Sequence, residues 1–483
     1  MCGIVGVLGQ HEVAPILVEA LKRLEYRGYD SAGIATVNGG VLGRRRAVGK
    51  LVNLSDLLVH DPLPGKSGIG HTRWATHGAP SVGNAHPHRA GAVAVVHNGI
   101  IENYRELRAE LAGHGIGFTT ETDTETVALL TQHYLQQGAA PVDAAFQALD
   151  RLEGAFALAF LFDGEEDLIV AARKGSPLAI GHGDGEMYLG SDAIALAPLT
   201  DRITYLEEGD RAVLTRAGAE IRDAQGTPVQ REMRTIQIDS TRIDKAGHKH
   251  FMAKEIAEQP AVIGDAIRHY LPVGGEAIAL PGEGVDFAPV KRLTMVACGT
   301  AFYACLTAKY WFEQLARLPV EVDIASEFRY REPPIDPGTL AIFVSQSGET
   351  ADTLAALRYC AGKAERCVAV VNVPESSIAR ESDLALPIHA GVEIGVASTK
   401  AFTCQLTVLL ILALKAAADR GTLSDEQIAD HVAALRGLPS VLNTALDQND
   451  AIRRTAQHMS EARDELFLGR GLMYPPALED DFK

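Results

Sequence analysis

Strands, turns and helices alternate strictly from residue 291 onward, and this pattern constrains the fold more than any other feature of the sequence. The expected strands are the apolar runs Leu293–Ala297, Leu340–Val344, Cys367–Asn372 and Leu384–His389. The expected helices between and after them are Ala301–Leu315, Ala351–Ala364 and Thr399–Arg420. Repetition of strand, turn and helix predicts an α/β domain with a doubly wound parallel sheet.

The first 215 residues have a different organisation, in which strands and helices are mixed rather than alternating. The expected strands are Ile4–Leu8, Ala92–His97, Ala155–Phe162 and Leu168–Ala172. The expected helices are Pro15–Leu24, Asn103–Ala112 and Thr124–Gln137, the last preceded by the capping-box pattern Thr122-x-x-Glu125. This mixture predicts an α+β sandwich for residues 1–215.

The remaining segments complete the expected domain organisation. Residues 216–290 are interrupted by glycine and proline around one helix-like stretch, His250–Tyr270, and are interpreted as a linker and first helix. Residues 291–424 form the second domain. Residues 425–483 are interpreted as a helical segment followed by a strand and turn at Leu466–Gly471.

Composition excludes several classes of protein. The net charge of −17 disfavours general binding to nucleic acid or to an anionic membrane. Six cysteines in 483 residues do not make a disulfide scaffold, and no Cys-x-x-Cys pair suggests structural zinc. The longest strongly apolar stretch, Leu406–Leu414, is shorter than the roughly 20 residues that span a bilayer. We therefore expect a cytoplasmic protein that binds neither nucleic acid nor membrane.

Four features near the N-terminus could carry chemistry. If Met1 is removed, the free α-amine of Cys2 can act as base toward its own thiol; alternatively, Cys2 is a small buried residue. Arg73 offers a planar fork for a carboxylate and Trp74 can cover a bound ligand; alternatively, Gly70–Gly78 is an ordinary polar loop with one buried indole. Asn98 and Gly99 can form a two-donor oxyanion hole or an ordinary hairpin turn. Asp123 could carry chemistry, or it is an ordinary carboxylate in the first turn of a helix, where the helix dipole favours it.

Five segments in order resemble the glutaminase domain of class II amidotransferases. They are Cys2–Gly6, Tyr26–Ser31, Arg73–Gly78, Asn98-Gly99 and Asp123. The resemblance implies an N-terminal-nucleophile fold with two stacked antiparallel sheets between helices, and attack of the cysteine on the side-chain amide of glutamine.

The resemblance also implies a role for each matching residue. Cys2 would be the nucleophile, with Asn98 and Gly99 as oxyanion donors. Arg73 and Asp123 would bind the α-carboxylate and α-amine of glutamine. Trp74, Thr76 and His77 would belong to a covering loop. The histidines His71, His77, His86, His88 and His97 lack helical ligand spacing, so we expect no metal site.

A hydroxyl-rich turn follows the second expected strand of the C-terminal half. Ser345–Thr350 opens a helix, where hydroxyls, backbone N–H groups and the helix terminus suit a phosphate dianion; the alternative is simple N-capping. Cys298-Gly299-Thr300 occupies the equivalent turn of the first strand. Because ligands collect at the carboxyl ends of parallel strands, we expect the two turns to lie close together.

These turns and Glu393–Lys400 resemble the first sugar isomerase domain of the isomerising glutamine–fructose-6-phosphate aminotransferases. Together with Glu255–Pro260, the resemblance runs nearly from end to end. It implies that a sugar phosphate is held by Thr300, Ser345, Gln346, Ser347 and Thr350, with Val396 and Ser398 near the sugar chain. Ala301 stands where the family usually has serine, which puts one phosphate hydroxyl in doubt.

The resemblance implies conversion of fructose 6-phosphate and glutamine to glucosamine 6-phosphate and glutamate by a homodimer, without cofactor or metal. Only the start of the family's second sugar isomerase domain is matched before Lys483, so we expect a truncated C-terminus and an inactive isomerisation step. Two alternatives remain open: an enzyme that only hydrolyses glutamine, and a sugar-phosphate-binding protein without turnover.

Overall fold

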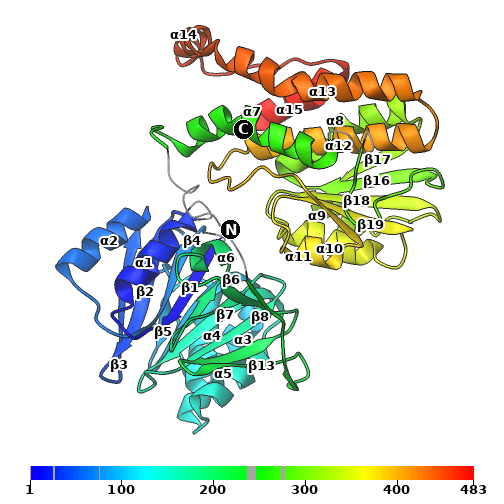
Figure 1. Cartoon of the computed structure of the whole chain (residues 1–483). Helices are drawn as coiled ribbons and strands as arrows, with labels where there is room; N and C mark the ends of the chain where they lie inside the picture. The colour runs from blue at the N-terminus through cyan, green and yellow to red at the C-terminus, as the bar shows by residue number, and fades with distance from the viewer. Residues whose placement is uncertain (1, 26–27, 76, 236–245, 273–277, 483) are drawn as a thin grey trace. The chain divides into compact units, whose positions relative to one another are not determined.

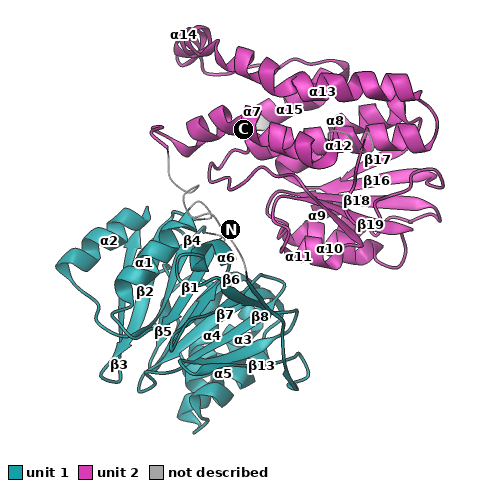
Figure 2. Cartoon of the chain, in the orientation of Figure 1, with its two compact units in different colours: residues 1–243 teal, residues 244–483 magenta. Residues whose placement is uncertain are grey.

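The structure is a computed structural model that describes residues 2–25, 28–75, 77–235, 246–272 and 278–482. The chain divides into two compact units, unit 1 (residues 1–243) and unit 2 (residues 244–483). Figure 1 follows the chain through both units, and Figure 2 colours them separately.

Unit 1 contains two antiparallel sheets. The 8-stranded sheet has the order β15-β11-β9-β10-β1-β4-β2-β3. Its strands are β1 (Gly3–Leu8), β2 (Ser31–Asn38), β3 (Val41–Val48), β4 (Ser67–Arg73), β9 (Ala179–His182), β10 (Met187–Gly190), β11 (Arg202–Tyr205) and β15 (Met233–Thr235). The 7-stranded sheet has the order β14-β13-β12-β8-β7-β6-β5. Its strands are β5 (His88–Ala90), β6 (Val93–Ile101), β7 (Gly154–Phe162), β8 (Ile169–Lys174), β12 (Arg211–Thr215), β13 (Gly218–Arg222) and β14 (Pro228–Val229).

The two sheets pack face to face through apolar side chains. Ile4 and Leu8 of β1 share one buried cluster with Val96 of β6 and Ala157 of β7. The helices of this unit are α1 (Ala14–Lys22), α2 (Leu51–His60), α3 (Tyr104–Gly113), α4 (Asp123–Gln136), α5 (Pro141–Leu149) and α6 (Ala193–Leu196). Helix α1 packs on β1 and β4, while α4 packs on β5 and β6. The expected α+β sandwich of stacked antiparallel sheets between helices is confirmed.

Two local details differ from the expectations. Residues 216–235, which we assigned to a linker, contribute β13, β14 and β15 to the sheets of unit 1. The capping pattern before α4 forms only in part. The Thr122 hydroxyl accepts a hydrogen bond from the Glu125 N–H, but the Glu125 carboxylate bonds to Thr119 and Thr120 instead of returning to Thr122.

Unit 2 is built on a 5-stranded parallel sheet of order β17-β16-β18-β19-β20. Its strands are β16 (Arg292–Ala297), β17 (Val320–Ile324), β18 (Thr339–Ser345), β19 (Arg366–Val371) and β20 (Leu384–Pro387). One face is covered by α7 (Phe251–Tyr270), α8 (Gly299–Leu315) and α12 (Lys400–Asp419), and the other by α9 (Ala325–Arg331), α10 (Ala351–Cys360) and α11 (Ser377–Glu381) (Figure 1). The expected doubly wound sheet is confirmed.

The last segment is helical except for one stretch. It contains α13 (Asp425–Leu446), α14 (Asn449–Met459), the 3-10 turn η3 (Gly471–Met473) and α15 (Tyr474–Phe482). The strand expected at Leu466–Leu468 is wrong, because these residues are irregular and pair with none of the described strands. Leu466 and Leu468 are 82% and 83% exposed, so their apolar character does not reflect burial in a sheet.

Helix α12 is the one helix in the described part of the chain that is long and apolar enough to cross a membrane. In its most apolar window, 67% of the residues are buried inside the structure. It packs against α7 and α8 in the core of unit 2. Its composition is therefore that of a core helix.

Candidate active site

Cys2 immediately precedes β1, a central strand of the 8-stranded sheet between β10 and β4. The Trp74 N–H donates to its sulfur at 3.3 Å, and the Trp74 carbonyl lies 3.5 Å from the same atom. Burial raises the pKa of the Cys2 thiol, and the hydrogen bond with the Trp74 backbone lowers it in part. The resting thiol therefore keeps its proton, which a base must remove when the sulfur attacks.

Arg73 ends β4, the strand next to β1, and is 4% exposed. Its Nη2 donates to the carbonyl of Gly78 at 3.1 Å and to that of His77. Its Nη1 is buried and has no hydrogen-bond partner among the described residues. Burial lowers the pKa of Arg73, while the nearby Cys2, Asp30 and Asp123 raise it. A buried guanidinium with an unused N–H is a ready donor for a carboxylate.

Asn98 lies near the end of β6, and both polar atoms of its side-chain amide have hydrogen-bond partners. Its Nδ2 donates to the Cys2 carbonyl at 3.1 Å. Its Oδ1 lies 3.0 Å from Nε2 of the buried His71, which is also 2.9 Å from the His97 carbonyl. Because both neighbours are acceptors, Nε2 of His71 carries the proton. The amide N–H₂ of Asn98 is thereby directed toward Cys2.

Gly99 follows Asn98 in the left-handed region, with φ of +121°. A Cβ at this position would lie 2.0 Å from the carbonyl oxygen of Ala155 on β7. Only glycine fits here, because both the dihedral angle and the close backbone exclude a side chain.

Asp123 is the first residue of α4 and is 4% exposed. Its carboxylate accepts hydrogen bonds from the backbone N–H groups of Ile101, at 2.9 Å, and Thr124, at 3.0 Å. It also lies 3.8 Å from Nδ1 of His97. This carboxylate ties α4 to the end of β6, and it also lines the same pocket as Cys2.

The loop after β4 is held in place by Asp30, the residue just before β2. Asp30 donates its backbone N–H to the Arg73 carbonyl at 3.0 Å, and its carboxylate accepts from the Ala75 N–H at 2.7 Å. Trp74 is 41% exposed and makes an edge contact with Tyr29. His77 is half-buried against Tyr104. Tyr26, Arg27 and Thr76 lie outside the described residues.

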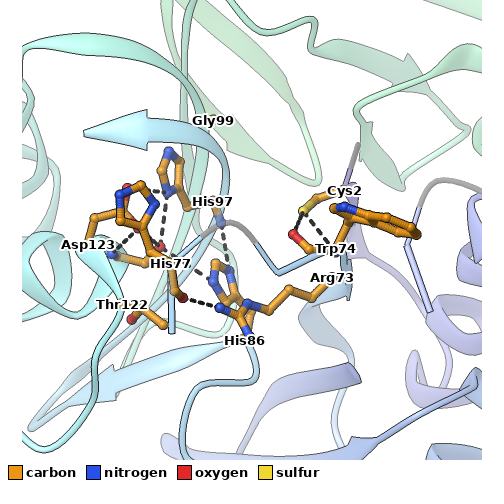
Figure 3. Close-up of a pocket in the computed structure, with 10 residues that line it drawn as sticks. Cys2, Arg73, Trp74, His77, His86, His97, Gly99, Thr122 and Asp123 are labelled. Carbon is orange, nitrogen blue, oxygen red and sulfur yellow. Dashed lines mark hydrogen bonds and ion pairs between the residues drawn. The ribbon is translucent and has the colours of Figure 1, made fainter. Parts of the chain in front are cut away.

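These residues converge on one pocket, which Figure 3 shows with Cys2 and Trp74 together and the side chain of Arg73 reaching toward His86 and His77. The pocket is lined by Cys2, Arg73, Trp74, His77, His86, His97, Gly99, Thr122, Asp123 and Thr124. Sequence reasoning missed Thr122 and Thr124, although their place beside Asp123 was an available signal. It considered His86 and His97 only as metal ligands.

The histidines in and around this pocket form a buried polar layer. His71 and His86 stack at 4.2 Å, and Thr124 Oγ1 lies 2.9 Å from Nδ1 of His97. Burial lowers the pKa of His71 to about 3 and also lowers the pKa of His86, His88 and His97. These rings are therefore neutral at physiological pH and act as hydrogen-bonding groups rather than charges.

The hydroxyl-rich turn of unit 2 connects β18 to α10. Ser345 Oγ accepts a hydrogen bond from the Gly348 N–H at 3.0 Å and lies 2.9 Å from Thr350 Oγ1, while Ser347 Oγ accepts from the Glu349 N–H. The Gln346 carbonyl accepts from Asn372 N–H after β19. The hydroxyls of Ser345 and Ser347 thus shape the turn at the N-terminus of α10.

The other predicted sugar-phosphate residues lie on two further segments. Thr300, in the first turn of α8 after β16, donates its hydroxyl to Glu479 of α15 at 2.8 Å. Because β16 and β18 are paired and parallel, the turns at Thr300 and Ser345 lie at the same edge of the sheet. Ser398 donates to Glu393 at 2.9 Å, and Val396 is 71% exposed.

Comparison with known proteins assigns both units to families. Residues 72–198 match a glutamine amidotransferase domain, and residues 286–415 match a SIS domain. Along its whole length the chain is 58% identical to the glutamine–fructose-6-phosphate aminotransferase [isomerizing] of Bradyrhizobium diazoefficiens, of which it covers 80%. It is 56% identical to the protein of that name from Brucella abortus, with the same coverage. The chain therefore belongs to the isomerising glutamine–fructose-6-phosphate aminotransferase family.

Proposed function

We propose that this enzyme transfers nitrogen from glutamine to fructose 6-phosphate and so produces glucosamine 6-phosphate and glutamate. The names of its relatives support this assignment. The observation that carries it is the pocket in which the Cys2 sulfur lies with Arg73, whose buried Nη1 has no partner among the described residues. The pocket therefore contains a nucleophile for an amide and a group that can bind a carboxylate. Glutamine, an amino acid with a side-chain amide, has both features.

Cys2 is the proposed nucleophile. Its sulfur attacks the side-chain amide carbon of glutamine, and the thiol proton passes to a base, for which the α-amine of Cys2 is available after removal of Met1. The amide carbonyl becomes an oxyanion, and the donors proposed for it are Asn98 Nδ2 and the Gly99 N–H. The C–N bond then breaks, protonated nitrogen leaves as ammonia, and water hydrolyses the thioester to glutamate.

Arg73 and Asp123 are the proposed binding groups for the amino-acid end of glutamine. The unused N–H of Arg73 suits the α-carboxylate, and the carboxylate of Asp123 suits the α-ammonium. Trp74, Thr76 and His77 are the proposed covering residues. The exposure of Trp74, whose backbone N–H donates to the sulfur of Cys2, supports this role.

The Ser345–Thr350 turn is the proposed phosphate site. Its support is the position of four polar side chains, Ser345, Gln346, Ser347 and Thr350, at the N-terminus of α10, where the helix dipole favours an anion. Thr300 is the proposed contributor from the neighbouring strand, and Val396 and Ser398 are proposed to lie along the sugar.

Location and assembly are also proposals. A cytoplasmic homodimer that binds neither nucleic acid nor membrane agrees with the family, the net charge of −17 and the six cysteines without disulfide partners. Light scattering of the purified protein measures the mass of the assembly.

The proposed function is tested by assaying glutamate and glucosamine 6-phosphate in the same reaction, with fructose 6-phosphate and either glutamine or ammonia as nitrogen source. The proposal predicts both glutamate and glucosamine 6-phosphate from glutamine; glutamate alone would instead agree with the inactive isomerisation step expected from the sequence. Glutamate without glucosamine 6-phosphate would leave only the glutaminase half, and absence of both products would contradict the proposal.

A further inference from the structure

Residues 388–399 connect β20 to α12 without forming a helix or strand, and the last part of this connection, residues 393–399, includes the proposed sugar contacts Val396 and Ser398. A segment of this kind needs other partners for its backbone polar groups. Two buried carboxylates supply them. One belongs to the segment itself, and the other comes from α7, more than a hundred residues earlier in the chain.

The carboxylate within the segment is Glu393, which is 6% exposed. It accepts hydrogen bonds from the Ser398 hydroxyl at 2.9 Å, from the Thr399 N–H at 2.9 Å and from the Ala401 N–H at 3.1 Å. Glu393 therefore closes the segment into a loop and caps the N-terminus of α12. Burial raises the pKa of Glu393, and these hydrogen bonds lower it in part.

The carboxylate from α7 is Glu255, which is 2% exposed. Its Oε1 accepts from the Ile394 N–H at 2.6 Å, and the Gly395 N–H lies 3.1 Å from both carboxylate oxygens. An added Cβ on Gly395 would lie 2.4 Å from Glu255 Oε2, so the backbone approaches this carboxylate as closely as glycine allows. Two adjacent N–H groups held by one carboxylate fix the direction of the chain just before Val396.

A second contact on α7 lies next to the first. Glu258 accepts a hydrogen bond from the buried Nζ of Lys400 at 2.7 Å, and Lys254 approaches the same carboxylate at 3.5 Å. Helix α7 therefore holds the segment before Val396 through Glu255 and after Ser398 through Glu258. Val396, between these anchors, is 71% exposed.

From these contacts we infer that Glu255 is a positioning residue for the sugar-phosphate site, because it fixes the backbone at Ile394 and Gly395 and so sets the position of Val396 and Ser398. The inference rests on the proposed function, since it assigns a purpose to a loop that would contact the sugar. Glu255 touches no substrate in this account and acts only through the loop.

The test compares the 483-residue wild-type protein with the variants Glu255→Gln and Gly395→Ala. The glutamine amide retains the size of the side chain but has one acceptor oxygen and no charge, and Gly395→Ala displaces the same carboxylate from the loop side. Asp265→Asn is the matched control, because Asp265 lies on the same helix, is half-exposed and forms an ion pair with Arg268 three residues further along.

Three quantities are measured: affinity for fructose 6-phosphate by titration calorimetry, amide hydrogen exchange at residues 394 and 395, and glutamine hydrolysis. Both variants are expected to bind the sugar phosphate roughly tenfold more weakly or worse, the effect of losing one charge-assisted hydrogen bond. They should also exchange faster at these amides, with unchanged glutamine hydrolysis. Asp265→Asn should match the wild type.

Failure of this inference and failure of the proposed function give different results. If the wild type binds fructose 6-phosphate and both variants bind it equally well, the inference is overturned and the proposed function stands. If the wild type does not bind it, the proposed function itself is contradicted, and this inference with it. Should Glu255→Gln fail to fold, Gly395→Ala decides the question.

Discussion

Asn98 shows how one side chain can be prepared for a reaction by its neighbours. His71 holds its amide oxygen, and the amide nitrogen is left to face Cys2. If this nitrogen stabilises the oxyanion, Asn98→Ala should lower kcat for glutamine hydrolysis by about 10²–10³ and change KM much less, because the charge develops only in the transition state. Steady-state kinetics check this. A large rise in KM with unchanged kcat would instead assign Asn98 to ground-state binding.

Arg73 and Asp123 differ in how completely their polar atoms are used. Arg73 has an unused buried N–H, whereas the Asp123 carboxylate already accepts two backbone hydrogen bonds. We expect Arg73→Ala to raise KM for glutamine by one or more orders of magnitude, since a charge-assisted hydrogen bond contributes about 1.5–3 kcal/mol. Simple amides without an α-carboxylate serve as the control substrate, and their hydrolysis should change little.

The Asp123→Asn variant separates the two interpretations of that residue. Loss of glutamine affinity with an unchanged unfolding midpoint would support the α-amine site. A lower midpoint with unchanged affinity would show that Asp123 serves only to tie α4 to β6.

At the level of elements, the turn between β18 and α10 depends on Gly348. Its φ is +65°, and an added Cβ would lie 1.9 Å from Ser376 Oγ at the start of α11. Gly348→Ala should destabilise unit 2 by roughly 2 kcal/mol or more, because backbone strain adds to a steric clash. Gly362→Ala is the matched control, since Gly362 has φ of +73° but no atom within 4 Å of the added Cβ. Denaturant unfolding measures both, and equal losses would contradict the predicted clash.

The strands around the pocket carry a pH dependence of stability. His71 on β4, His88 on β5 and His97 on β6 are buried, and burial lowers the pKa of each. Below about pH 6.5 these histidines take up protons in the unfolded chain but stay neutral in the folded chain. The folded state therefore has its full stability above this pH. It loses stability as the pH falls toward the pKa of the folded state, which is about 3 for His71. His71, with a folded pKa of about 3, should by itself cost roughly 1 kcal/mol by pH 5.5, and His88 and His97 act in the same direction.

Thermal unfolding of unit 1 at pH 7.5 and 5.5 measures this effect. The midpoint should be clearly lower at pH 5.5, and the difference should shrink in His88→Asn, which removes one of the buried rings. A midpoint that is the same at both pH values would contradict the assignment of neutral buried histidines.

Much of the molecule could be predicted from the sequence where the signal is local. The apolar runs at Ile4–Leu8 and Leu340–Val344 were sufficient to place β1 and β18, because buried strands need such composition. The strand expected at Leu466–Leu468 shows the limit of that signal, since a short apolar run indicates a strand only if another strand pairs with it.

The part of the site that sequence reasoning missed depends on contacts between distant segments. The pairing of His71 with Asn98 and of Glu255 with Ile394 joins elements whose proximity follows from the fold and not from spacing. Cys2 and Arg73 were found because the resemblance to a known family assigns their roles, which the spacing of residues alone does not. Thr122 and Thr124 were missed because they line the pocket on either side of a residue that was already explained.

For the whole molecule, the central claim is that unit 1 hydrolyses glutamine through Cys2. The most direct test is the rate of glutamate formation from glutamine by Cys2→Ala, with Cys298→Ala in unit 2 as the control; Cys298 is also half-buried, and burial likewise raises the pKa of its thiol. Cys2→Ala is expected to lose glutamine hydrolysis with an unchanged unfolding midpoint, while Cys298→Ala retains it. Glutamate formation by Cys2→Ala at the wild-type rate would show that Cys2 is not the nucleophile.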